Sequence, residues 1–181
     1  MRTFVAIDLP EDLKKSIANF IRDLQKLDVV DASFTKPEQL HLTLKFLGEV
    51  KEEDVEKIKN VLANITRNAK KFELQLMGFG HFNYRILWIG GNSGQQQAIE
   101  LANKIDLELN KLGFEKETRP FEVHLTLARV KWWKNKDALK DLLEKYRNKV
   151  WGTFAVDEIK LMKSTLSRQG PIYETIEKFI F

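Results

Sequence analysis

The sequence spells one four-residue phrase twice, as His41-Leu42-Thr43-Leu44 and as His124-Leu125-Thr126-Leu127, 83 residues apart in a chain with only three histidines. Each copy lies in a run that alternates apolar and polar residues, 40–47 and 121–130, which predicts two half-buried β-strands. Side chains at i and i+2 of a strand share a face and lie roughly 6.5 Å apart. Each strand therefore directs a histidine and a threonine to one side and two leucines to the other, where the leucines can pack on a core.

This pairing of side chains suggests a site for a phosphate group. One phosphate fits across the gap between the histidine and the threonine of a strand, and two such strands facing each other would supply an acid and a base. A single His-x-Thr is usually only a polar strand face in solvent. Identical copies at matching places of an internal repeat favour the functional interpretation.

The rest of the chain follows a repeated order of elements. In the first half we predict a strand at 2–8, a helix at 11–27, a loop at 31–39, the first motif strand, a helix at 52–68 and a hairpin of strands 72–79 and 84–90 that turns at 80–83. In the second half we predict a helix at 95–112, the second motif strand, a helix at 136–149 and strands at 153–163 and 172–179.

These elements predict an α/β (α+β) fold. A shift of 83 residues puts strand on strand, helix on helix and histidine on histidine. We expect a single domain, 1–181, made of two pseudo-symmetric lobes that correspond to sequence repeats at about 1–80 and 84–163, with strand 171–180 closing the fold. Each lobe would be a small, mostly antiparallel sheet backed by two helices. The two polar strand faces would then meet in a cleft between the lobes, where binding sites are common.

Composition limits the class of protein. The chain is 43% hydrophobic with 12 Phe and 4 Trp, which is enough for a real core. No apolar run approaches the ~20 residues that span a bilayer, and the N-terminus lacks a signal-peptide pattern, so we expect a soluble, cytoplasmic protein. We also expect it to be a monomer. Because there is no cysteine, disulfides, thiolate catalysis and cysteine-based zinc sites are excluded. The net charge of +4 permits an anionic partner.

The motifs and their flanks resemble those of the 2H phosphoesterase superfamily. The resemblance covers essentially the whole chain and is greatest to the bacterial and archaeal RNA 2′,3′-cyclic phosphodiesterases, formerly called 2′-5′ RNA ligases. It rests on the opening strand 2–7, on the first motif from His41 to Gly48, and on the second motif from Arg119-Pro120-Phe121 through His124 to Ala128-Arg129.

This resemblance implies a mechanism without metal or cofactor. His41 would be the proton donor, His124 the proton acceptor, and Thr43 and Thr126 would bind the phosphate oxygens. Histidine suits both roles because its side chain ionises near pH 6.5. The reaction would open a 2′,3′-cyclic phosphate to a 2′-phosphomonoester, and its reverse would join a cyclic end to a 5′-hydroxyl through a 2′-5′ bond. The substrates would be RNA with cyclic ends, such as tRNA fragments, or cyclic nucleotides.

Three further residues are candidates for substrate binding. Arg129 matches an arginine of the family, but strict alternation places it on the face of Leu125 and Leu127, so it reaches the site only if the strand bends or bulges. Lys45 shares the face of His41, and could either bind phosphate or be solvated. Trp132 lies in a basic stretch, 129–136, which either binds RNA by stacking or forms a core tryptophan and a charged turn.

Two other classes of function compete with this interpretation. A zinc hydrolase could use His41, His124 and His81 as ligands, although the spacing does not require it and His81 falls in a predicted hairpin turn. A nucleotide-binding or RNA-binding module could keep the fold without turnover, although the presence of both motifs argues against that. Sensitivity to chelators and turnover of any 2′,3′-cyclic nucleotide would separate these alternatives.

Overall fold

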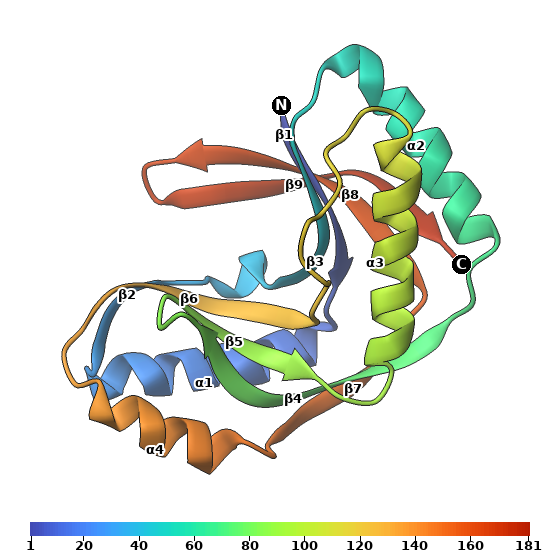
Figure 1. The fold of residues 1–181 in the computed structure, drawn as a ribbon. Coiled ribbons are helices and arrows are strands. Elements are labelled where there is room, and N and C mark those ends of the chain that lie inside the picture. The colour runs from blue at the N-terminus through green and yellow to red at the C-terminus, as the bar shows by residue number, and fades with distance from the viewer.

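The structure, a computed structural model that describes residues 1–181, contains two antiparallel sheets that face each other (Figure 1). The four-stranded sheet has the order β3-β1-β8-β9. Its strands are His41–Glu49, Arg2–Asp8, Glu158–Ser167 and Gly170–Ile180. The five-stranded sheet has the order β2-β6-β5-β4-β7. Its strands are Val30–Phe34, His124–Trp133, Ile86–Gly91, Phe72–Phe82 and Val150–Val156.

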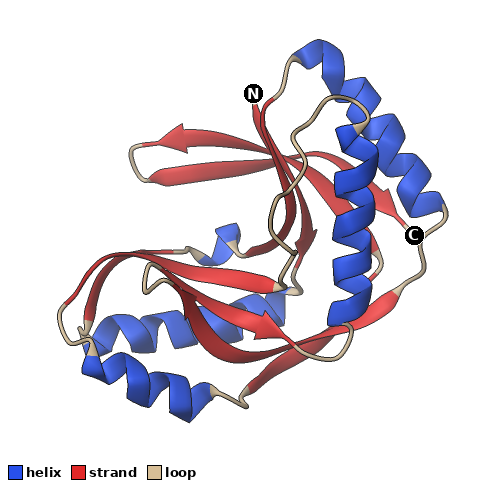
Figure 2. Ribbon diagram, in the orientation of Figure 1, coloured by secondary structure: helices blue, strands red, loops and turns tan.

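Each sheet is backed by two helices, as the sequence predicted (Figure 2). Helices α2 (Glu52–Arg67) and α3 (Gln95–Asn110) lie against the four-stranded sheet, and α1 (Glu11–Leu27) and α4 (Asp137–Tyr146) lie against the five-stranded one. A short 3-10 helix, η1 (Pro37–Gln39), precedes β3. The predicted α+β class is therefore confirmed. None of these helices combines the length and the apolar character needed to cross a membrane.

The two sheets have matching strand orders, and the sequence repeat relates three of the four pairs of strands. The order β3-β1-β8 corresponds to β6-β5-β4, the outer strands β9 and β7 take equivalent places without matching in the sequence, and β2 is added at the edge of the second sheet. The register agrees, since Ile7 pairs with Leu42 as Ile89 pairs with Leu125. Each sheet nevertheless takes strands from both halves of the chain, and α1 leaves β1 to cover the opposite sheet. Both lobes thus contain elements of both repeats, which joins them through several chain crossings.

The motif leucines anchor both motif strands in one core. Leu42 and Leu44 are 3% and 5% exposed, Leu125 and Leu127 are 0% exposed, and all four belong to the same large apolar cluster. Burying one leucine side chain is worth about 1.5–3 kcal/mol. The apolar half of the repeated phrase therefore fixes the strands, and the polar half is left to face the space between the sheets.

Three local predictions were wrong. The predicted loop at 31–39 contains β2, whose five residues are too few to show a clear alternation. The predicted strand 153–163 is two strands of different sheets, β7 and β8, because the chain changes sheets at Asp157 without a glycine or proline to mark the break. The β4–β5 turn lies later than predicted, at 83–85, where Asn83 and Tyr84 take positive φ angles of 50° and 60° and the Arg85 amide donates to the Phe82 carbonyl at 2.9 Å.

Candidate active site

The polar faces of β3 and β6 line one cleft between the sheets. Its volume is about 1260 Å³, and its walls include His41, Thr43, His124 and Thr126. Strands β3 and β6 lie close together, and the β8–β9 hairpin projects over the other side of the cleft (Figure 1). The four side chains singled out from the sequence are therefore brought together in one place.

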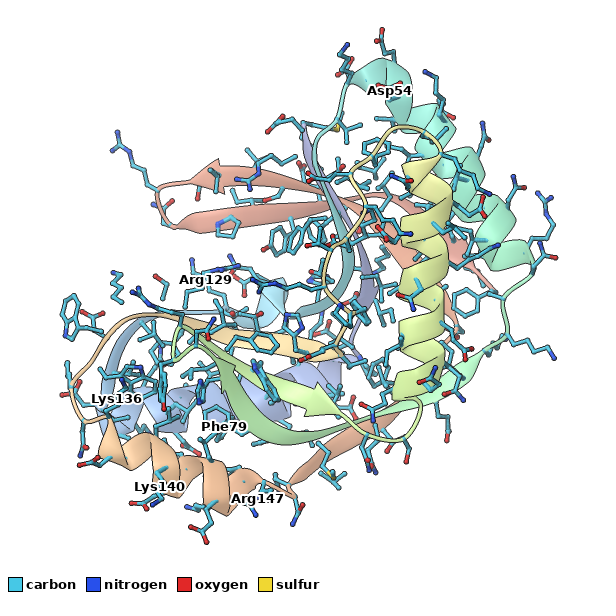
Figure 3. All side chains as sticks on the ribbon, in the orientation of Figure 1. Asp54, Phe79, Arg129, Lys136, Lys140 and Arg147 are labelled. Carbon is cyan, nitrogen blue, oxygen red and sulfur yellow. The ribbon has the colours of Figure 1, made fainter.

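A matching β-bulge in each motif strand decides which later residues reach the cleft. In β3 the pairing steps from Val5–Lys45 to Ala6–Thr43, and in β6 it steps from Leu87–Ala128 to Trp88–Thr126. One extra residue thus interrupts the alternation and turns the following side chains to the other face. Because of the bulge, Arg129 is exposed and lines the cleft on the same face as His124 (Figure 3).

The same kind of bulge turns Lys45 away from the phosphate position. Lys45 is 2% exposed, and its Nζ donates to Asp106 Oδ1 at 2.6 Å and to the Glu115 carbonyl at 2.8 Å. It borders the cleft, but its ammonium is engaged in tying β3 to α3 and to the loop that leads to β6. These contacts support a structural role for Lys45 rather than the substrate contact that the sequence suggested.

The two adjacent tryptophans near the end of β6 lie in different surroundings. Trp133 is half-buried, packs against the core and donates its indole N–H to the Tyr84 carbonyl at 2.9 Å. Trp132 is 57% exposed and is not among the residues that line the cleft. The structure thus separates Trp132 from the two histidines.

His124 is held in one tautomer by the backbone. Its Nδ1 lies 2.9 Å from the carbonyl oxygen of Glu122. A carbonyl oxygen can only accept, so Nδ1 carries the proton and the neutral ring has a free lone pair on Nε2. The Phe82 ring packs edge-on against the imidazole with ring centroids 5.1 Å apart. His124 is therefore oriented as a proton acceptor.

His41 has different partners. Only 7% of its side chain is exposed, its Nε2 lies 3.4 Å from Asp8 Oδ1, and its Nδ1 makes no hydrogen bond. Burial lowers the pKa of His41 below its ordinary value of 6.5. The Asp8 carboxylate opposes that shift, and so does the backbone of Gln39. An ionised carboxylate can only accept, so the nitrogen that faces Asp8 carries a proton.

Other cleft residues escaped the sequence analysis. Phe46 is 65% exposed and lies on β3 at the place that Arg129 occupies on β6, which the 83-residue shift could have shown. Tyr173 comes from β9, and its ring packs edge-on against His41 at 5.9 Å. The cleft is also lined by Arg119, which the sequence analysis placed at the start of the second motif, and by four cationic side chains that it did not single out, namely Lys36, Arg85, Lys116 and Arg168.

The third histidine does not join the other two. His81 lies near the end of β4, where its Nδ1 accepts the Tyr84 amide at 2.9 Å and its ring stacks on the Tyr84 ring. It is not among the cleft residues, and no group of three or more histidine or carboxylate side chains is arranged to hold a metal ion.

Comparison with known proteins identifies the family. The domain described as "AKAP7 2′5′ RNA ligase-like domain" matches residues 4–181. The RNA 2′,3′-cyclic phosphodiesterase of Methanocaldococcus jannaschii is 41% identical over 181 residues, which are 99% of this chain and 100% of that protein. The protein of the same name from Methanothermobacter thermautotrophicus is 36% identical over 99% of this chain and 98% of its own. The chain belongs to the RNA 2′,3′-cyclic phosphodiesterase family of 2H phosphoesterases.

A solved structure agrees with this family membership. Escherichia coli LigT complexed with 3′-AMP superposes with a TM-score of 0.82 at 27% identity, covering 99% of this chain and 97% of that chain. The resemblance that the two His-x-Thr motifs indicated is therefore confirmed over the full length of the fold.

Proposed function

We propose that this phosphodiesterase-family chain hydrolyses RNA 2′,3′-cyclic phosphate ends to 2′-phosphomonoesters, with His41 as general acid, His124 as general base and no metal ion. The observation that carries the proposal is the pair of histidines in one cleft with opposite partners. His124 Nδ1 faces a carbonyl, and His41 Nε2 faces a carboxylate. One ring is thus set to take a proton and the other to give one.

The reaction follows from this arrangement. His124 Nε2 takes a proton from water, the hydroxide attacks phosphorus, and the bond from phosphorus to the ribose 3′ oxygen breaks. His41 gives its Nε2 proton to the departing oxygen, and the phosphate stays on the 2′ oxygen. General acid–base groups of this kind contribute about 10²–10⁴-fold each.

Thr43, Thr126 and Arg129 complete the phosphate site. Both hydroxyls and the guanidinium lie on the cleft faces of the strands that carry the histidines. They can donate to the non-bridging oxygens, where negative charge grows in the transition state. A guanidinium also offers a fork of two donors that matches a phosphate.

The cleft suits an RNA strand better than a single nucleotide. Ligand pockets usually measure about 300–1,000 Å³, whereas this cleft has a volume of about 1260 Å³. Its cations can contact successive phosphates, and the exposed Phe46 ring can stack on a base. RNA fragments with cyclic ends, such as those of tRNA, are therefore the substrates we propose.

The same site can also join RNA ends. The 5′-hydroxyl of a second RNA would attack the cyclic phosphate from the place where water stands in hydrolysis, so His124 would take its proton and His41 would again protonate the departing 3′ oxygen. The product would be a 2′-5′ phosphodiester bond.

The proposal is tested by offering the protein an oligoribonucleotide with a 2′,3′-cyclic end and locating the phosphate in the product. We expect the 2′-phosphate from the wild type and from His81→Ala, the matched control at the third histidine. His41→Ala and His124→Ala should yield almost none. A 3′-phosphate as main product would refute the assignment of the leaving oxygen, and binding without turnover would favour a binding module.

A further inference from the structure

The two catalytic histidines stand at equivalent register positions but have different neighbours. On the four-stranded sheet, His41 pairs with Asp8 of β1. On the five-stranded sheet, His124 pairs with Gly90 of β5. The preceding pairs, Ile7–Leu42 and Ile89–Leu125, match. The repeat thus places a carboxylate beside one histidine and no side chain beside the other.

Asp8 is held in its ionised form by an arrangement of buried cations. Its Oδ1 accepts from Lys14 Nζ at 2.8 Å and from the Leu9 amide at 2.9 Å, and its Oδ2 accepts from Lys160 Nζ at 2.6 Å. Both lysines are 8% exposed. Against the opposing effect of burial, the hydrogen bonds from Lys14 and Lys160 lower the pKa of Asp8 to about 2. The carboxylate therefore keeps its charge over the whole neutral range.

The charges around His41 make Asp8 necessary for a protonated ring. Lys14 of α1 and Lys160 of β8 both disfavour the imidazolium, and the Tyr173 ring of β9 packs edge-on against the imidazole. The Glu11 carboxylate lies 3.7 Å from the Lys14 ammonium, and the Glu158 carboxylate lies 3.8 Å from the Lys160 ammonium, so each offsets the charge of its lysine only in part. Without Asp8, a largely buried imidazole would face two buried ammonium groups. Such a ring would be neutral in the range where an acid is needed.

We infer that Asp8 is a positioning residue that keeps a proton on His41 Nε2 and thereby makes His41, rather than His124, the acid of the pair. The inference rests on the proposed acid–base function. Asp8 acts through His41, because it lines neither wall of the cleft. Its distance of 3.4 Å from Nε2 exceeds a strong hydrogen bond, so the proton remains available to the leaving oxygen.

The test compares Asp8→Asn with the wild type across pH. The asparagine Oδ1 can still accept from Leu9 and Lys14, but its Nδ2 replaces the Oδ2 that accepts from Lys160, so the side chain keeps its size while the negative charge and the Lys160 hydrogen bond are removed. A neighbouring carboxylate is worth about 1–3 pKa units to a histidine. The ratio of variant to wild-type kcat/KM should therefore be highest at the acidic end of the profile, should fall at least about 10-fold as the pH rises through the acidic range, and should level off by neutral pH.

Nuclear magnetic resonance of the imidazole rings gives a second readout. The chain has only three histidines, so the His41 signal can be assigned by its loss in His41→Ala. The His41 pKa should fall in Asp8→Asn and recover in Asp8→Glu. In Lys14→Met it should rise, because one opposing cation is gone. Glu158→Gln is the matched control, since this carboxylate touches Lys160 but not His41.

These outcomes separate this inference from the proposed function. If His41→Ala keeps its activity, the acid–base function itself fails. If His41→Ala is inactive but Asp8→Asn loses the same factor at every pH with an unchanged His41 pKa, Asp8 is only structural and the inference is overturned. If Asp8→Asn does not fold, an unchanged His41 pKa in Lys14→Met overturns the inference, and a raised one supports it.

Discussion

Replacing Lys45 with methionine tests whether this buried cation holds the fold or the substrate. Methionine keeps most of the apolar stem but removes the ammonium that bonds Asp106 and Glu115. The Lys45 side chain is 1% exposed and that of Asp106 13%, so the substitution leaves a nearly buried carboxylate without its cation. Asp106 keeps one hydrogen bond, from the Glu117 amide at 3.1 Å.

The expected loss follows from this geometry. Breaking a buried ion pair by removing one partner costs about 3–5 kcal/mol, and the remaining amide contact argues for the lower end, about 3 kcal/mol. For a chain of 181 residues this corresponds to a fall in Tm of about 6–12 °C. Because the ammonium does not reach the phosphate position, kcat/KM for a cyclic substrate at a temperature well below Tm should stay within about 3-fold of the wild type.

Guanidinium unfolding and steady-state kinetics on the same preparations measure both quantities. Lys104→Met is the matched control, because that lysine pairs with Glu108 at 3.2 Å on the same helix but is 55% exposed. Exposed pairs contribute about 0–1 kcal/mol, so the control should lose little. A Lys45→Met protein of unchanged stability, with KM raised more than about 10-fold and kcat kept, would show that Lys45 binds substrate and would refute the structural role.

Four further outcomes are expected. His41→Ala and His124→Ala should each lower kcat by about 10²–10⁴-fold with little change in stability, and near-normal turnover by either variant would contradict the paired mechanism. Activity should survive exhaustive chelation, and a loss with EDTA that one divalent ion restores would favour the zinc site. Because burial lowers the pKa of His41 below 6.5, the free enzyme loses its acid as the pH rises through the mildly acidic range, so kcat/KM should trace a bell rather than rise to a plateau. Arg168→Ala should raise KM for cyclic-ended oligonucleotides more than for a cyclic mononucleotide, whereas Arg67→Ala, exposed on the far helix α2, should change neither.

The sequence predicts well what depends on local pattern. The alternation around each His-Leu-Thr-Leu phrase predicts both the strands and the burial of their leucines, because the period of two is a property of the strand itself. The long amphipathic helices α1 and α2 are predicted to within a residue for the same reason. The duplication also predicts that the two polar faces meet in one cleft.

What depends on pairing between distant strands could not be predicted. Strict alternation predicts that Lys45 faces the cleft and that Arg129 faces the core. The β-bulges reverse this, and they become visible only in the register of β1 and β5 against the motif strands. Tyr173 and Arg168 reach the cleft because β9 returns beside β8, a contact that no local pattern in the C-terminal segment contains.

The differences between the two repeats fall where the chemistry needs them. A duplicated strand supplies two like groups, whereas opening a cyclic phosphate requires an acid on one side and a base on the other. The matched positions that break the symmetry beside the two phrases include Asp8 against Gly90, Lys45 against Ala128 and Phe46 against Arg129. The first gives one histidine a carboxylate, the second fixes one strand to α3, and the third puts an aromatic ring on β3 where β6 has a guanidinium. The repeated strands thus build a symmetric cleft. Single side chains beside the motifs differ between the two repeats, and they make the surroundings of the two histidines unequal.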